Sequence, residues 1–249
     1  MFAYDTPMLC FLLCAMLEPQ ADDLSVLIFS KTAPYHGRDF EYRHEAIPEG
    51  TAAIRAIGER EGWTVDATED ASRFNDETLA RFDVVVFLLT TGDVLGVKAE
   101  AAFERFIRSG KGYVGIHSAS DTEHAWPWYG ELVGAYFKGH PPIQEATYTV
   151  ENRSHPATKD LPERWTRTDE HYNFHTNPRR DVNVLMALDE SSYDVGDGAM
   201  SDHPISWYRE YDGGRAFYTA LGHVKESYDD PLVLRHLQGG IAWAGSKEP

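Results

Sequence analysis

Three short apolar segments constrain the fold of this chain most strongly. They are LSVLIFS (residues 24–30), DVVVFLL (residues 83–89) and GYVGI (residues 112–116). Each is hydrophobic at nearly every position, which is typical of a strand covered on both faces. Amphipathic segments with helical spacing, residues 49–62 and 98–110, lie between them, and each ends at a glycine. This alternation predicts an α/β protein with a mostly parallel sheet and helices on both of its faces.

The pattern changes beyond Gly134, where strand-like segments follow one another with few helices between them. They are EATYTV (residues 145–150), VNVLMAL (182–188), PISWYREY (204–211) and GRAFYTAL (214–221). An amphipathic helix is expected over residues 230–245, at the end of the chain. Because no repeat and no low-complexity linker interrupts the sequence, we expect one domain over residues 23–246 with a β-rich second half.

Charge and cysteine content exclude several classes of function. The chain has 40 acidic and 23 basic side chains, for a formal net charge of -17. Such a surface repels phosphate backbones and anionic lipid, so neither nucleic acid nor a membrane surface is an expected partner. Both cysteines, Cys10 and Cys14, lie near the start. A disulfide framework, a thiolate zinc site and a cysteine nucleophile are therefore excluded from residue 15 onward.

The first 22 residues leave two interpretations open. MLCFLLCAML (residues 8–17) has the length of a signal-peptide core and is too short to span a membrane. No lysine or arginine precedes it, Asp5 does, and no A-x-A cleavage site follows. The segment is either a degenerate export signal or an N-terminal extension. We expect a cytoplasmic protein, with export as the open alternative.

Several histidines are expected where ligands bind to open parallel sheets, beyond the carboxyl ends of the strands. His117 follows GYVGI directly, where some α/β enzymes place a nucleophile on a sharp turn. An imidazole there suits general acid–base chemistry or metal binding. Ser118, beside it, is a further candidate nucleophile. Similar positions are predicted for His36, His140, His203 and His223, whereas we interpret His44, His124, His155 and His236 as structural or solvated.

The segment TDEHYNFH (residues 168–175) adds a carboxylate to these candidates. If it is extended, Glu170 and Tyr172 share one face, and His171 and His175 share the other. Three or more converging histidines with Glu170 would also suit a divalent metal, but the spacing does not decide this. The aromatic segments HAWPWYG and SWYREY either stack on sugars or pack in the core. Neither a glycine-rich phosphate loop nor a G-x-S-x-G motif is present.

Taken in order, several segments resemble the ThuA-like (trehalose-utilisation) family between residues 24 and 245. They are VLIFSKTAPYHGR, FDVVVFLLTTGDVL, FERFIRSGKGYVGIHSASDTE, WYGELVGAYFKGHP, TDEHYNF, HPISWYREYDGGRAFYTALGH and LQGGIAWA. The resemblance implies a class I glutamine amidotransferase-like fold of flavodoxin-like architecture, with His117 in the place of the amidotransferase cysteine. Amidotransferase chemistry is thereby excluded. The resemblance also implies use of trehalose or related disaccharides through 3-keto sugars. It favours Glu170 over His171 as the side chain that faces the pocket. The implied pocket residues are His36, His117, His140, Glu170, Tyr172, His203 and His223.

These observations support one leading hypothesis and two alternatives. The leading one is an enzyme acting on a disaccharide or 3-keto-glycoside as a lyase, hydrolase or isomerase. His117 or Glu170 would remove the proton beside the ketone, while His223 or Tyr172 stabilises the resulting oxyanion. His36, His140, His203 and Ser118 would bind the substrate. The sequence indicates no particular cofactor, and a divalent metal stays open. The alternatives are a non-catalytic sugar-binding or regulatory domain and a hydrolase using Ser118; a homo-oligomer is also left open.

Overall fold

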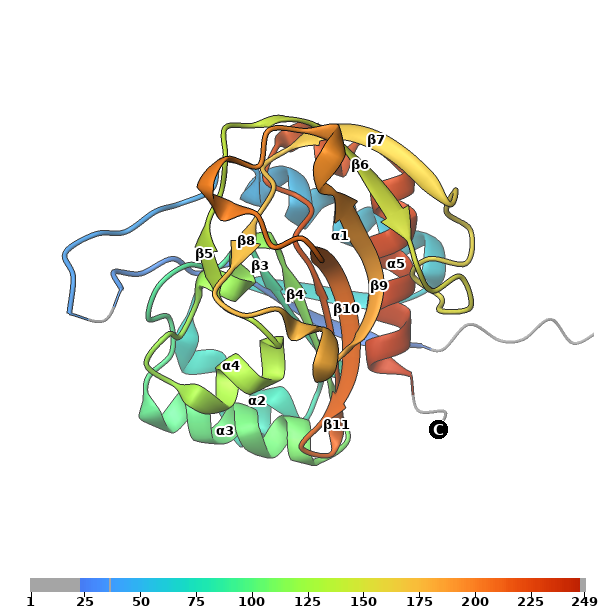
Figure 1. The fold of residues 1–249 in the computed structure, drawn as a ribbon. Helices are drawn as coiled ribbons and strands as arrows, with labels where there is room; N and C mark the ends of the chain where they lie inside the picture. Colours follow the sequence, from blue (N-terminus) through green and yellow to red (C-terminus); the bar gives the residue numbers. More distant parts are fainter. Residues whose placement is uncertain (1–22, 36, 247–249) are drawn as a thin grey trace, which may run out of the picture.

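A mixed sheet of nine strands lies at the centre of the computed structural model, which describes residues 23–35 and 37–246 (Figure 1). In chain order its strands are β1 (Ser25–Phe29), β2 (Thr64–Thr68), β3 (Val84–Leu88), β4 (Gly112–Ile116), β6 (Gln144–Val150), β7 (Arg164–Asp169), β9 (Asn183–Asp189), β10 (Pro204–Tyr211) and β11 (Gly214–Thr219). Their order across the sheet is β2-β1-β3-β4-β11-β10-β9-β6-β7. The strands β5 (Phe137–Gly139) and β8 (Asn173–Phe174) pair separately.

The sheet is parallel in one half and antiparallel in the other. Strands β2, β1, β3, β4 and β11 run parallel. The alternating pattern predicts this for the strands of the first half, whereas β11 comes from the strand-rich second half. From β11 onward the pairs β11–β10, β10–β9, β9–β6 and β6–β7 are antiparallel, so the expected mostly parallel sheet is corrected to a mixed one. One cause is the short β10–β11 connection, in which Asp212 and Gly213 both have positive φ. Such a two-residue turn can join only antiparallel strands.

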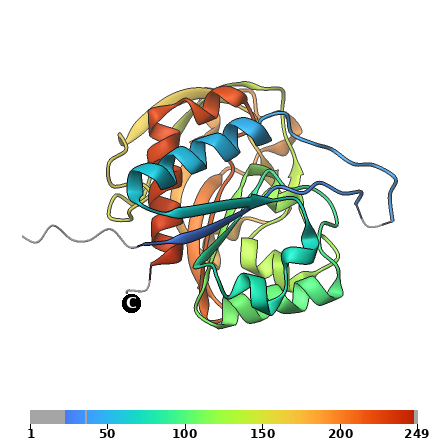
Figure 2. The same ribbon diagram turned by 180° about the vertical axis from the view of Figure 1, so that it is seen from behind.

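Helices cover both faces of the sheet (Figure 2). They are α1 (Ile47–Glu61), α2 (Asp76–Leu79), α3 (Val97–Arg108), α4 (Pro127–Val133) and α5 (Pro231–Gly245). Helices α1 and α5 pack on one face, and α2, α3 and α4 lie on the other. Helix α1 ends at Gly62, whose φ of 76° gives a left-handed cap that other residues adopt at a cost. Asn75 caps the start of helix α2, and its side chain accepts a hydrogen bond from Thr78 N.

The two central strands determine where a functional site can lie. Every residue of β3 and β4 is buried, because helices cover both faces at this point. Strand β4 pairs in parallel with β11, and Ile116 lies opposite Thr219. The residues that follow these two strands therefore emerge side by side at one edge of the sheet.

The structure does not describe residues 1–22 or His36, so the interpretations of the N-terminal segment and of His36 concern residues outside the described part. Within residues 23–35 and 37–246, no helix is long and apolar enough to cross a membrane. A single domain over residues 23–246 stays a prediction.

Candidate active site

His117 occupies the sharp turn at the end of β4. Its φ of 52° lies in the left-handed region, which costs a non-glycine residue about 1–2 kcal/mol. The carbonyl oxygen of His117 accepts hydrogen bonds from Tyr218 Oη at 2.8 Å and Ser120 Oγ at 3.3 Å. These bonds offset part of the strain and fix the direction in which the fully buried imidazole points.

The residues after β11 hold the ring of His117 and supply a second histidine. His117 Nδ1 lies 2.8 Å from the carbonyl oxygen of Ala220. Because a carbonyl oxygen only accepts, Nδ1 carries a proton and donates it, which leaves Nε2 to face the site. There His117 Nε2 lies 3.2 Å from His223 Nδ1. The parallel pairing of β4 with β11 is thus the direct cause of this contact.

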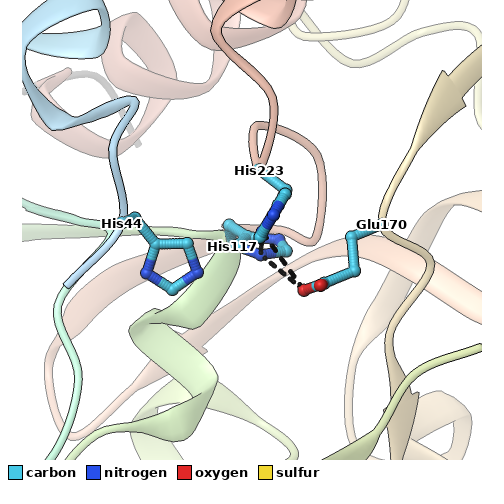
Figure 3. A group of neighbouring side chains, drawn as sticks. All are labelled: His44, His117, Glu170 and His223. Atoms are coloured by element: carbon cyan, nitrogen blue, oxygen red, sulfur yellow. Dashed lines mark hydrogen bonds and ion pairs between the residues drawn. The ribbon is translucent and has the colours of Figure 1, made fainter. Parts of the chain in front are cut away.

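Glu170 lies at the centre of the site and contacts three histidines. Its Oε2 atom is 3.3 Å from His117 Nε2 and 3.2 Å from His223 Nδ1 (Figure 3). Its Oε1 atom is 3.2 Å from His140 Nε2. Glu170 follows β7, at the edge of the sheet far from β4 in sequence. The carboxylate therefore joins the antiparallel half of the molecule to the parallel half.

His44 completes a group of three imidazoles around this carboxylate. Its ring centroid lies 5.1 Å from that of His117 and 5.2 Å from that of His223, and these two are themselves 5.1 Å apart. One potential ligand atom from each of His44, His117, Glu170 and His223 falls within 4.8 Å of the others. Ser118 Oγ lies 3.3 Å from His44 Nδ1. These four side chains are the residues of the site that could hold a metal ion.

Burial and the single carboxylate of Glu170 determine the pKa values of the clustered side chains. Burial tends to raise the pKa of Glu170, but the neighbouring imidazoles of His117 and His223 hold it well below the ordinary value. Burial tends to lower the pKa of His223, yet its hydrogen bond and charge interaction with Glu170 raise it. Burial, with the neighbouring His117 and His223, lowers the pKa of His44 to about 2. Glu170 is therefore ionised and His44 neutral at physiological pH.

A cavity of about 350 Å³ opens onto one side of the group. It is lined by Tyr35, Phe40, Tyr42, His44, Asp121, Phe137, His140, Glu170 and Tyr172. An adjoining cavity of about 500 Å³ shares Tyr35, Phe40, Asp121 and Phe137 with it. The side chain of His140 is 41% exposed, whereas that of Glu170 is 8% exposed and that of His117 is fully buried. His140 is therefore the most accessible histidine that contacts Glu170.

Tyr172 lies between the cavity and His117. The two ring centroids are 4.0 Å apart, and Phe137 packs against the tyrosine at 4.1 Å. Burial, together with the charge of Glu170, raises the pKa of Tyr172 well above its ordinary range, so the phenol keeps its proton. His171 points away from the site, because its Nε2 atom lies 2.8 Å from the carbonyl oxygen of Gln144. Glu170 and Tyr172 thus share the cavity side, as alternation along the chain predicts.

Two expected site residues lie elsewhere. His203 does not contact the carboxylate of Glu170; its ring nitrogens lie 2.8 Å from Tyr172 O and 2.9 Å from Glu190 Oε1. His203 therefore contacts the backbone of Tyr172 and not the cluster around Glu170. Ser118 is fully buried and does not line the cavity, so its hydroxyl supports His44 from behind. The tryptophans considered for sugar stacking pack instead, for example Trp207, whose Nε1 donates to Val133 O.

Sequence reasoning missed His44 and most of the aromatic wall of the cavity. The sequence pattern favours a structural or solvated role for His44, but the structure places its ring against His117 and His223. The available signal was its place between β1 and α1, in the same loop as the candidate His36. Tyr35, Phe40 and Tyr42 come from that loop as well. Phe40 and Tyr42 are among the exposed large hydrophobic side chains, as expected of a surface that takes a ligand.

The structure is similar to several solved structures. A ThuA-like protein from Bacteroides uniformis is 26% identical, with a TM-score of 0.75, and the similarity covers 93% of this chain and 95% of that one. A ThuA-like protein from Parabacteroides merdae is 19% identical, with a TM-score of 0.71 and 90% of each chain covered. A β-galactosidase from Bacillus circulans shares the fold at 12% identity and a TM-score of 0.55, over 89% of this chain and 31% of its own. No curated protein matches the chain.

The sequence itself matches one family model over most of its length. The matched residues are 25–244, which include every strand of the described residues and nearly all of α5, and the model describes ThuA, trehalose utilisation. The four clustered side chains and the cavity all lie within these bounds. The chain therefore belongs to the ThuA family of trehalose utilisation.

Proposed function

We propose that the protein acts on a carbohydrate that carries a ketone at C3, and that it removes the proton from the adjacent carbon, C2. The observation that carries this proposal is the contact between Glu170 Oε1 and His140 Nε2, which lie 3.2 Å apart on the wall of the cavity. A ketone makes the neighbouring C–H bond acidic, and an imidazole whose protonated form is stabilised by a carboxylate is a suitable base for such a proton. Members of this family are described by trehalose utilisation, which supports a sugar as the substrate.

His140 is the proposed base. Its Nδ1 atom lies 3.0 Å from the carbonyl oxygen of Pro141, so Nδ1 carries a proton and Nε2 is the atom that exchanges one. The carbonyl oxygen of Pro141 orients the ring, and Glu170 Oε1, 3.2 Å from Nε2, stabilises the imidazolium that forms when the proton arrives at that nitrogen. His117 and His223 hold the other carboxylate oxygen of Glu170. We therefore assign His117 a positioning role, because its buried ring reaches the cavity only through Glu170.

The step is a simple enolisation. The proton leaves C2 for His140 Nε2, the C–H electron pair becomes the C2–C3 double bond, and the ketone oxygen takes the negative charge. Tyr172, which lines the cavity and keeps its proton, is placed to donate a hydrogen bond to that oxygen. The intermediate can then expel the C1 substituent or take a proton back. Lyase, hydrolase and isomerase outcomes therefore share this first step.

The cavity has the character of a sugar site. Aromatic side chains from the loop after β1 and from β5 form one wall, and polar groups converge on the other. Tyr35 and Phe40 stack with their ring planes only 14° apart. Flat aromatic faces and a few placed polar groups are typical of small-molecule pockets. The shared wall with the larger adjoining cavity gives room for a second sugar ring.

The experiment measures exchange of the C2 proton with solvent. Purified protein is incubated in D₂O with 3-keto-trehalose or a 3-keto-glucoside, and NMR measures deuterium entering C2; trehalose, which lacks the ketone, is the control substrate. We expect exchange with the keto sugars alone, and a loss of about 10²- to 10⁴-fold in His140→Ala. With the single-ring 3-keto-glucoside, His175→Ala is the matched control, because His175 lines only the adjoining cavity, where a second ring would lie. Sugar binding without any exchange would overturn the proposal and favour a non-catalytic sugar-binding protein.

A further inference from the structure

We propose that one divalent transition-metal ion binds to four side chains of this site: His44, His117, Glu170 and His223. The ion keeps a coordination position open toward the cavity, where an oxygen of the sugar can reach it. Only this last point, the identity of the oxygen ligand, rests on the proposed function. The metal site itself is inferred from the geometry of the four side chains.

Three distances among these side chains have the values that a bound ion requires. His117 Nε2, His223 Nδ1 and Glu170 Oε2 are separated by 3.2, 3.2 and 3.3 Å, so they form a nearly equilateral triangle. Ligands about 2.0–2.1 Å from a tetrahedral zinc-type ion are roughly 3.3–3.4 Å apart, by simple trigonometry. The triangle therefore matches one face of such a coordination sphere without any movement of the side chains.

His44 supplies a fourth ligand atom within reach of this triangle. All four ligand atoms lie within 4.8 Å of one another, so His44 needs only a small approach to close the sphere. Its ring stands nearly perpendicular to those of His117 and His223, at interplanar angles of 87° and 82°. Ser118 Oγ, 3.3 Å from His44 Nδ1, offers that ring a second partner.

The orientation of His117 is the one found in metal-bound histidines. Its Nδ1–H donates to the carbonyl oxygen of Ala220 at 2.8 Å, so the Nε2 lone pair points toward Glu170 and His223. Histidines that bind metals usually donate their other ring proton to a carbonyl or carboxylate in this way, which fixes tautomer and direction. A single cation would satisfy the converging lone pairs of both histidines and the carboxylate together.

The ligand atoms also indicate which metals fit. Three imidazole nitrogens and one carboxylate oxygen suit Zn²⁺, Mn²⁺, Fe²⁺, Co²⁺ or Ni²⁺, whereas Mg²⁺ and Ca²⁺ prefer oxygen ligands. Within the described residues a second acidic group, Asp93, Glu100 and Glu123, is less suited. Glu123 Oε1 already accepts hydrogen bonds from Val94 N and Leu95 N, at 2.9 and 2.6 Å. That carboxylate connects two loops instead.

An ion in this position would face the substrate. His44 and Glu170 both line the cavity, whereas His117 and His223 lie behind them. The open coordination position would therefore point between Glu170 and the aromatic wall. A ketone or neighbouring hydroxyl oxygen bound there would be polarised, which acidifies the C2 proton that His140 removes.

The experiment measures metal binding without any sugar. Full-length protein is stripped with a chelator, dialysed, and titrated with Co²⁺, Zn²⁺ and Mn²⁺; the visible spectrum of Co²⁺ and elemental analysis give affinity and stoichiometry. We expect one ion per chain, with nitrogen-ligand bands in the Co²⁺ spectrum. Glu170→Gln and His44→Gln should each bind at least about 100-fold more weakly, since even residues behind the ligands are worth 10- to 100-fold.

Two control variants make the outcome decisive. Glu100→Gln alters the second acidic group, and His140→Ala removes the proposed base; both should retain one ion per chain. Circular dichroism establishes that every variant is folded. If the folded wild-type protein binds none of the three ions, or if Glu170→Gln binds as tightly as wild type, the metal site is wrong. Metal binding without deuterium exchange would overturn only the proposed function, and exchange that survives complete chelation would overturn only the contact between the ion and the sugar oxygen.

Discussion

Asp169 holds two of the four clustered side chains in place, which makes its substitution the most informative stability test. Its carboxylate is buried and accepts hydrogen bonds from Glu170 N at 3.0 Å, Gly222 N at 3.1 Å and Val224 N at 3.4 Å. Ser227 Oγ donates a fourth, at 3.1 Å. Two of these amides flank His223 in sequence, and a third belongs to Glu170. We expect Asp169→Asn to loosen both residues together.

The size of the loss can be worked out from these bonds. Oδ1 accepts from Glu170 and Val224, and Oδ2 accepts from Gly222 and Ser227, so an amide NH₂ at either position faces backbone donors. Hydrogen bonds to a charged group are worth about 1.5–3 kcal/mol each. Removing one partner of a buried ion pair costs about 3–5 kcal/mol, and Arg167 Nε lies 3.6 Å from Oδ2. We expect the free energy of unfolding to fall by about 3–5 kcal/mol.

Urea denaturation, followed by tryptophan fluorescence and circular dichroism, measures this change. Asp189→Asn is the matched control, because Asp189 also accepts from a backbone amide and an arginine but is much more exposed. Its effect should be clearly smaller. If Asp169→Asn lay within about 1 kcal/mol of wild type, the reasoning from buried hydrogen bonds would be refuted. Asp169→Asn should also bind metal more weakly, because it displaces Glu170 and His223. A loss of stability confined to another part of the molecule would leave metal affinity unchanged.

Two further predictions concern stability. Burial lowers the pKa of His236 from its ordinary 6.5 to about 4. The neutral ring therefore stabilises the folded state fully above about pH 6.5. Between pH 6.5 and 4 this contribution to the free energy of unfolding is lost, by up to about 3 kcal/mol. Urea titrations at pH 7.5, 5.5 and 4 should show this loss in wild type and a smaller one in His236→Asn; equal pH dependence would contradict it. Gly92→Ala should destabilise by at least about 2 kcal/mol, since φ is 79° and a Cβ would lie 1.9 Å from Ala33 O. Thermal unfolding tests this against Gly96→Ala, where the Cβ meets open space.

Much of the fold could be predicted from the sequence because its central strands are buried on both faces. Strands β1, β3 and β4 each fall inside a short, continuous run of apolar residues, which is typical of a strand buried on both faces. Strand β7 was not predicted. Its residues, Arg164–Asp169, alternate between exposed and less exposed positions at the edge of the sheet, and Arg164 and Arg167 resemble loop residues in sequence. An edge strand needs little apolar surface, so periodicity gives a weak signal there.

The site could be predicted only where a strand end determined the position. His117 and His223 follow β4 and β11, and the parallel pairing of these strands brings the two rings together. His44 lies in the loop between β1 and α1, and no apolar pattern fixes the path of that loop. His140 was expected to bind substrate, but its contact with Glu170 depends on how β5 and the end of β7 approach each other. Such long-range approaches are set by tertiary packing, which local patterns do not encode.

The four clustered side chains come from four separate segments of the chain, between residue 44 and residue 223. No fragment cut from either end of the chain would contain them all, and an unfolded chain would hold them far apart. A ligand that needs all four therefore binds the native state alone, and its binding free energy is added to that of folding. Across variants, ligand affinity and the free energy of unfolding should therefore rise and fall together. A bound ligand would indicate that the N-terminal and C-terminal parts of the domain have folded against each other.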